Sequence, residues 1–99
     1  MKYISPEDLN QLMKKDQDFQ LIDVRESYEY EDMNIGGDNI PLAELIDAKD
    51  RISRDKRVVL CCKTGKRSAA MSLTLERKFG LDNIYTLKGG LESYLETVK

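Results

Sequence analysis

The 99-residue sequence contains no histidine. Histidine supplies the base in Ser-His-Asp triads and Cys-His dyads, and it is a common zinc ligand. Its absence therefore excludes Ser-His-Asp triads, Cys-His dyads and histidine-based zinc sites. The sequence has only two cysteines, Cys61 and Cys62, and neighbours in sequence do not form the framework of a disulfide-stabilised domain. A cysteine nucleophile in this chain would therefore need activation without an imidazole.

A large charge excess and long apolar runs are also missing. The formal net charge is -2, without the basic excess typical of general nucleic-acid binders. No apolar run approaches the ~18 residues of a membrane span, and the first ten residues lack the apolar segment of a signal peptide. We therefore expect one cytoplasmic domain over residues 1–99 that binds neither nucleic acid nor a membrane.

Strand-like and helix-like segments alternate along the chain. Strands are expected at residues 20–24, 57–61 and 83–87, with a very short one at 39–40. Helices are expected after the N-cap Ser5, in the segment "RESYEYEDM", from Pro41, over residues 68–79 and after Gly89-Gly90. Four acids in "RESYEYEDM" show no metal pattern and predict a solvated face. The alternation predicts an α/β fold of three layers, α/β/α, with a central, mostly parallel sheet.

The segment "VVLCCKTGKRSAAM", residues 58–71, joins the clearest strand to a predicted helix. Ligands of parallel α/β sheets bind beyond the carboxyl ends of the strands, where this segment turns. Because successive strand residues point to opposite faces, we expect Cys61 to pack beneath a helix and Cys62 to fall in the loop. The pair therefore predicts one packing cysteine and one site cysteine.

We call residues 62–67 the cysteine loop, and its composition favours an anion site. Gly65 permits a tight turn whose inward amides form an anion-binding nest, and the following helix adds its positive end. Lys63 and Lys66 either attract an anionic donor or are solvated, whereas Arg67 is expected to hold the loop through its planar donors. Thiols in such surroundings ionise readily, and the thiolate is the nucleophile, so Cys62 is the predicted catalytic residue.

Four segments, in this order, resemble the rhodanese-homology family of sulfurtransferases. They are "LIDVRESYEYE", "NIPLAEL", "VVLCCKTGKRSAAM" and "LKGGLESYL", in which Tyr94 stands where a tryptophan is common. The resemblance covers nearly the whole chain and implies a rhodanese-like sheet of about five strands. It maps the nucleophile onto Cys62, which would carry a sulfane sulfur as a persulfide. We expect no cofactor and no metal.

Residues 34–38 read "NIGGD" where many family members carry His-Ile-Pro-Gly-Ala. This variant resembles rhodanese domains attached to enzymes that activate sulfur-carrier proteins. The resemblance therefore implies two classes of donor, a small anion such as thiosulfate or a persulfide on a donor protein. The acceptor would be a thiol, a sulfur-carrier protein or cyanide.

Two alternatives remain open. One is a non-catalytic interaction module on the same fold. The other is a cysteine-based phosphatase or arsenate reductase, which has five residues between its cysteine and arginine. In this chain four residues separate Cys62 from Arg67, namely Lys63, Thr64, Gly65 and Lys66. By the family rule the shorter loop fits a sulfur atom, and these residues are the predicted substrate-binding loop.

Asp23 and Arg25 flank Val24 at the end of a predicted strand. We expect them to brace the cysteine loop through ion pairs, with Asp23–Arg67 as one candidate pair, because breaking a buried pair is costly. The alternative is a salt bridge or solvated charge without a catalytic role.

Overall fold

The computed structural model describes residues 1–15 and 18–98. Within these residues one five-stranded sheet has the order β1-β5-β4-β2-β3, and every neighbouring pair is parallel. The strands are β1 (Lys2–Ile4), β2 (Phe19–Asp23), β3 (Asp38–Asn39), β4 (Arg57–Cys61) and β5 (Ile84–Leu87). The predicted α/β fold is confirmed, and the sheet is entirely parallel.

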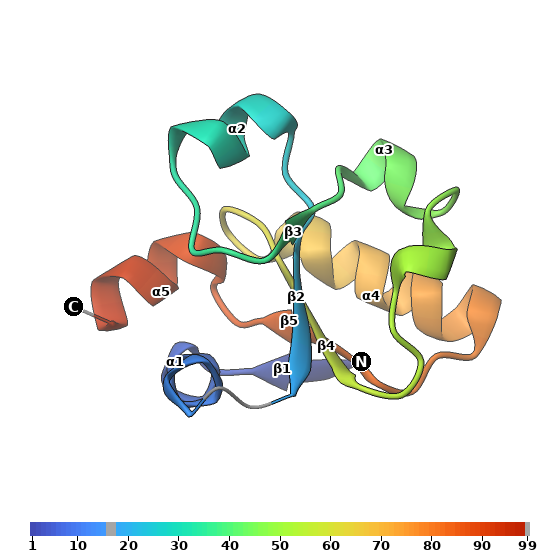
Figure 1. The fold of residues 1–99 in the computed structure, drawn as a ribbon, viewed down its shortest axis with the longest axis horizontal. Coiled ribbons are helices and arrows are strands. Elements are labelled where there is room, and N and C mark those ends of the chain that lie inside the picture. The colour runs from blue at the N-terminus through green and yellow to red at the C-terminus, as the bar shows by residue number, and fades with distance from the viewer. Residues whose placement is uncertain (16–17, 99) are drawn as a thin grey trace.

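The helices cover both faces of this sheet (Figure 1). They are α1 (Pro6–Lys14), α2 (Ser27–Asp32), α3 (Leu42–Leu45), the 3-10 turn η1 (Lys49–Arg51), α4 (Lys66–Phe79) and α5 (Gly90–Thr97). Helices α1 and α5 lie on one face and α3 and α4 on the other, whereas α2 lies beyond the carboxyl end of β2 (Figure 1). None of the helices in the described part of the chain is long and apolar enough to cross a membrane.

Helix boundaries follow the local sequence signals. The side chain of Ser5 accepts the N–H of Asp8 at 3.1 Å, and Pro6 is the first residue of α1, as predicted. Helix α4 begins at Lys66, two residues before the predicted start, and ends before Gly80 in a left-handed conformation. The sequence analysis missed β1, in which Lys2 and Tyr3 are exposed and only Ile4 is buried.

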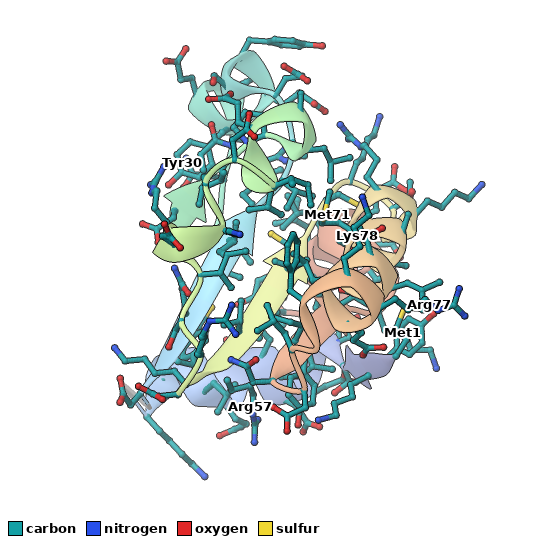
Figure 2. The ribbon with its side chains drawn as sticks, turned by 90° about the vertical axis from the view of Figure 1, so that its right-hand side faces the viewer. Met1, Tyr30, Arg57, Met71, Arg77 and Lys78 are labelled. Atoms are coloured by element: carbon teal, nitrogen blue, oxygen red, sulfur yellow. The ribbon has the colours of Figure 1, made fainter. Side chains whose placement is uncertain are left out.

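Strand alternation divides the apolar core into two clusters. The α4-side core contains Val58, Leu60 and Cys62 from β4 and its end, and the α5-side core contains Val59 and Cys61. Figure 2 looks onto the face that α4 covers, where the exposed Arg77 projects outward from the helix. Each fully buried Val or Leu side chain contributes about 1.5–3 kcal/mol, so both layers hold β4 firmly in the middle of the sheet.

Candidate active site

The cysteine loop leaves the carboxyl end of the central strand. Strand β4 lies between β2 and β5, and the N–H of Val24 extends the β2–β4 pairing by donating to the carbonyl of Cys61 at 2.9 Å. The segments that follow β2 and β5 therefore lie on either side of the loop. This placement is the one predicted for the active-site edge of a parallel sheet.

Two backbone donors and one hydroxyl acceptor surround the sulfur of Cys62. Its Sγ accepts the backbone N–H groups of Gly65 at 3.1 Å and Ser68 at 3.3 Å, and the thiol donates to the hydroxyl oxygen of Ser68 at 3.6 Å. The side chain is fully buried, so the sulfur lies beneath the loop and is closed off from solvent in this structure, which differs from the open anion site that the sequence analysis expected. Amide donors directed at one sulfur suit a thiolate, which is a stronger acceptor than a thiol.

Cys61 is equally buried, but its surroundings differ. It packs in the α5-side core, and its side chain forms no hydrogen bond with another described residue. Burial, together with the neighbouring charge of Asp23, raises the pKa of the Cys61 thiol. The predicted division holds in geometry, because one cysteine packs in the core and the other faces the amides of the loop.

The amino-terminal end of α5 fixes the backbone of the loop. The N–H of Leu91 donates to the carbonyl of Cys62 at 2.8 Å, and the N–H of Glu92 donates to the carbonyl of Lys63 at 3.0 Å. In a trans peptide the N–H points opposite to the C=O, so the N–H groups of Lys63 and Thr64 point away from α5. These bonds therefore set the direction of the loop amides.

Gly90 makes this close approach possible. A Cβ at this position would lie 2.5 Å from the carbonyl oxygen of Lys63 and 2.6 Å from that of Cys62, and its φ is +66°. The sequence analysis noted Gly89-Gly90 only as the point after which a helix begins and as part of a family segment. Gly65 has a φ of +95°, which confirms the predicted need for glycine in the turn.

Arg67 is held by Glu29, and the predicted candidate pair with Asp23 is wrong. Its two terminal nitrogens donate to the two carboxylate oxygens of Glu29 at 3.0 and 3.2 Å. The Arg67 guanidinium lowers the pKa of Glu29 to about 2. The brace between the loop and the rest of the molecule therefore runs to α2, through an acid that the sequence analysis assigned to a solvated face.

Asp23 pairs instead with Arg25, two residues along the chain. The Oδ2 of Asp23 accepts from Nη2 of Arg25 at 2.7 Å, and both side chains are buried. The same Nη2 donates to the carbonyl of Met33 at 2.7 Å, so the pair ties the end of β2 to the segment after α2. Both residues lie beside the loop through β2, and neither contacts Cys62 through a hydrogen bond in the described residues.

A pair of hydroxyls lies beneath the loop. The Oγ of Ser68 contacts the Oγ1 of Thr86 from β5 at 2.5 Å and lies 3.2 Å from the carbonyl of Gly65. Ser68 and Thr86 are fully buried, and the sequence analysis missed both as site residues. The signal available for Ser68 was its place at the start of a helix directly after the loop.

A groove opens beside the loop, between α2 and α5, with a volume of about 570 Å³. We define the groove by six of its lining residues, which are Tyr28, Met33, Lys63, Leu91, Glu92 and Leu95. Lys63 belongs to the cysteine loop, so the groove adjoins the loop at the residue that follows Cys62. Lys63, Thr64 and Lys66 are all exposed on this edge of the molecule.

The sequence matches the family described as "Rhodanese-like domain" over residues 5–97. The chain belongs to the rhodanese-like domain family. It is 32% identical to a rhodanese-related protein from Thermoplasma volcanium, whose structure superposes with a TM-score of 0.84 and covers 99% of this chain and 94% of that one. The predicted family and its five-stranded sheet are therefore confirmed.

Two curated relatives, both longer than this chain, contain a region similar to it. It is 46% identical to the uncharacterized protein YqhL of Bacillus subtilis over 81 residues, which are 81% of this chain and 64% of YqhL. It is 31% identical to the tRNA uridine(34) hydroxylase of Bartonella bacilliformis over 97% of this chain and 33% of that protein. The chain thus spans about two thirds and one third of these relatives.

Proposed function

We propose that this rhodanese-like domain is a sulfurtransferase in which Cys62 carries the transferred sulfur as a persulfide. The observation that carries the proposal is the convergence of the Gly65 and Ser68 amides on the Sγ of Cys62 at the carboxyl edge of the sheet. Such donors stabilise negative charge on sulfur without histidine, which the chain lacks.

The reaction has two steps that balance without an oxidant or a reductant. The Cys62 thiolate attacks the outer sulfur of a donor R–S–SH, a new S–S bond forms, and R–S⁻ leaves and takes up the proton. With thiosulfate as donor, sulfite is the leaving group. An acceptor thiolate then attacks the outer sulfur on Cys62, which becomes R′–S–SH after protonation and restores the Cys62 thiolate.

Four amides of the loop are available to the outer sulfur. The N–H groups of Lys63, Thr64, Lys66 and Arg67 donate no hydrogen bond to another described residue. Those of Lys66 and Arg67 belong to the first turn of α4, where amides lack partners within the helix. A persulfide anion on Cys62 would supply the missing acceptor, and this interaction matters most where charge develops.

The occupied guanidinium of Arg67 argues against a phosphatase. A planar donor fork is the usual partner of a phosphate, but here Glu29 takes both terminal nitrogens. The loop also has one residue fewer than a phosphatase loop. A non-catalytic interaction module would not require two backbone amides directed at the sulfur of Cys62, so this arrangement favours the sulfurtransferase.

The test is the mass of the intact protein after incubation with thiosulfate or glutathione persulfide. We expect an adduct of one sulfur atom, lost in Cys62→Ser and retained in the matched variant Cys61→Ser. Cys61 is a suitable control because it is an adjacent, equally buried cysteine with a raised pKa. An adduct that survives Cys62→Ser, or no adduct with any donor on folded protein, would refute the proposal.

A further inference from the structure

Exposed apolar side chains gather in the groove beside the cysteine loop. Five large hydrophobic residues are more than a third exposed in the described part of the chain, and three of them line the groove. These are Tyr28 (72% exposed), Leu95 (46%) and Met33 (37%). Exposed apolar side chains that cluster in a concave surface mark a binding site, whereas scattered ones are ordinary.

The groove is joined to the reactive sulfur through the backbone. Lys63 follows Cys62 directly, and Leu91, at the groove floor, donates its N–H to the carbonyl of Cys62 at 2.8 Å. A molecule seated in the groove therefore lies next to the loop that would take up its sulfur. Its volume is well within the ~300–1,000 Å³ of ligand pockets and far exceeds what a thiosulfate ion would fill.

The charges on the groove favour a basic occupant. Arg25 and Glu29 also line it, but each already has a buried or bidentate partner. Asp32 and Glu92 are exposed carboxylates with no ion pair to another described residue, and Lys63 is the remaining cation. The two free carboxylates attract basic side chains and disfavour an anionic ligand along the groove.

We propose that the groove docks an extended, cysteine-bearing segment of a partner protein, with an apolar and a basic side chain near its persulfide. The inference rests on the proposed function and selects the protein persulfide over thiosulfate as the donor for which the site is shaped. The apolar side chain packs against Tyr28 and Leu95, the basic one faces Asp32 and Glu92, and the outer sulfur is held at Lys63, next to the buried Cys62. Sulfur transfer then proceeds by the balanced first step given above.

Synthetic peptide persulfides test this docking. The probes are Lys-Leu-Cys-Leu-Lys and Glu-Leu-Cys-Leu-Glu, each persulfidated on cysteine, with thiosulfate as the small donor. We expect the basic peptide to load Cys62 at least about tenfold faster than the acidic one at low salt, with the difference shrinking at high salt. Equal rates for the two peptides would overturn the inference.

A matched pair of variants locates the contact. Tyr28→Ser should lower the ratio of the loading rate with the basic peptide to that with thiosulfate by about tenfold, as expected for a buried aromatic contact. Tyr3→Ser makes the same change at a 55% exposed tyrosine on β1, away from the groove, and should leave that ratio unchanged. Equal ratios in the two variants would contradict the docking site.

A binding experiment separates failure of docking from failure of catalysis. The basic peptide with serine in place of its cysteine is titrated into isotopically labelled protein, and amide shifts are expected at Tyr28, Met33 and Leu95. These shifts without any sulfur adduct would refute the sulfurtransferase and keep the docking site. Adduct formation without these shifts would refute the docking site and keep the sulfurtransferase. A concentration-dependent dimer of the chain that Tyr28→Ser abolishes would also refute the docking of a partner segment, because a second copy would then occupy the groove.

Discussion

Replacing Gly90 by alanine tests whether α5 sets the geometry of the cysteine loop. The new Cβ would lie 2.5 Å from the carbonyl oxygen of Lys63 and 2.6 Å from the amide nitrogen of Gly65, both of which are backbone atoms. Backbone atoms cannot rotate away as a side chain can, so α5 and the loop must separate. Gly80 is a matched control, because its φ of +64° resembles the +66° of Gly90 and no atom lies within 4 Å of an added Cβ.

The expected losses of stability differ between the two positions. An alanine in the left-handed region costs about 1 kcal/mol at either site. Separation of α5 from the loop would also weaken the bonds from Leu91 to Cys62 and from Glu92 to Lys63, at roughly 0.5–1.5 kcal/mol each. Gly90→Ala should therefore lower the free energy of unfolding by about 3 kcal/mol, and Gly80→Ala by about 1 kcal/mol.

The rate of sulfur loading should separate the variants further. A displacement of the loop amides by about 1 Å can slow a reaction on the order of 100-fold, so we expect that loss in Gly90→Ala and a wild-type rate in Gly80→Ala. Urea denaturation measures stability, and mass spectrometry of protein quenched during reaction with thiosulfate measures the rate. Equal stability losses, or a wild-type rate in folded Gly90→Ala, would refute this account of the loop.

Two further predictions concern the supports of the loop. The pKa of Glu29 is about 2, below its ordinary 4.5, so the pair with Arg67 contributes stability above about pH 4.5 and loses it as the pH falls toward 2. Because the Arg67 side chain is 37% exposed, Glu29→Gln should lower the free energy of unfolding by only about 0.5–1 kcal/mol at pH 7, as measured by urea denaturation. Near pH 2 the substitution should have almost no effect on stability, and equal losses at the two pH values would contradict the pairing. Ser68→Ala should slow sulfur loading about tenfold and leave the hydroxyl of Thr86 without its partner. Adding Thr86→Val should recover stability but not rate, and recovery of both would assign Ser68 a structural role alone.

Local patterns were sufficient to predict the central part of the fold. The run of β-branched and apolar residues in β4, followed by a glycine turn and a helix, carries its own signals. Strand alternation alone is sufficient to assign Cys61 and Cys62 to opposite faces of the sheet. Strand β1 escaped prediction because it has three residues, two of them exposed, and exists through pairing with β5 some eighty residues later. Such non-local pairing leaves no periodicity in the sequence.

The ion pairs could not be assigned from sequence for a related reason. Asp23–Arg67 was one candidate pair, but Arg25 is closer to Asp23 along the chain and forms the ion pair with it. The true partner of Arg67, Glu29, lies 38 residues away on a short polar helix. Choosing among several acids on that helix requires its orientation, which depends on packing rather than on composition.

The opposite directions of the two neighbouring cysteines would determine the fate of a sulfur carried on Cys62 as proposed above. Cys61 points into the α5-side core and Cys62 into the α4-side core, with the sheet between them. These are the only thiols of the chain, so a persulfide on Cys62 has no internal partner that could resolve it to a disulfide while β4 is intact. The lifetime of the loaded protein would then be set by the arrival of an external acceptor, which is the behaviour required of a carrier that hands its cargo to another molecule.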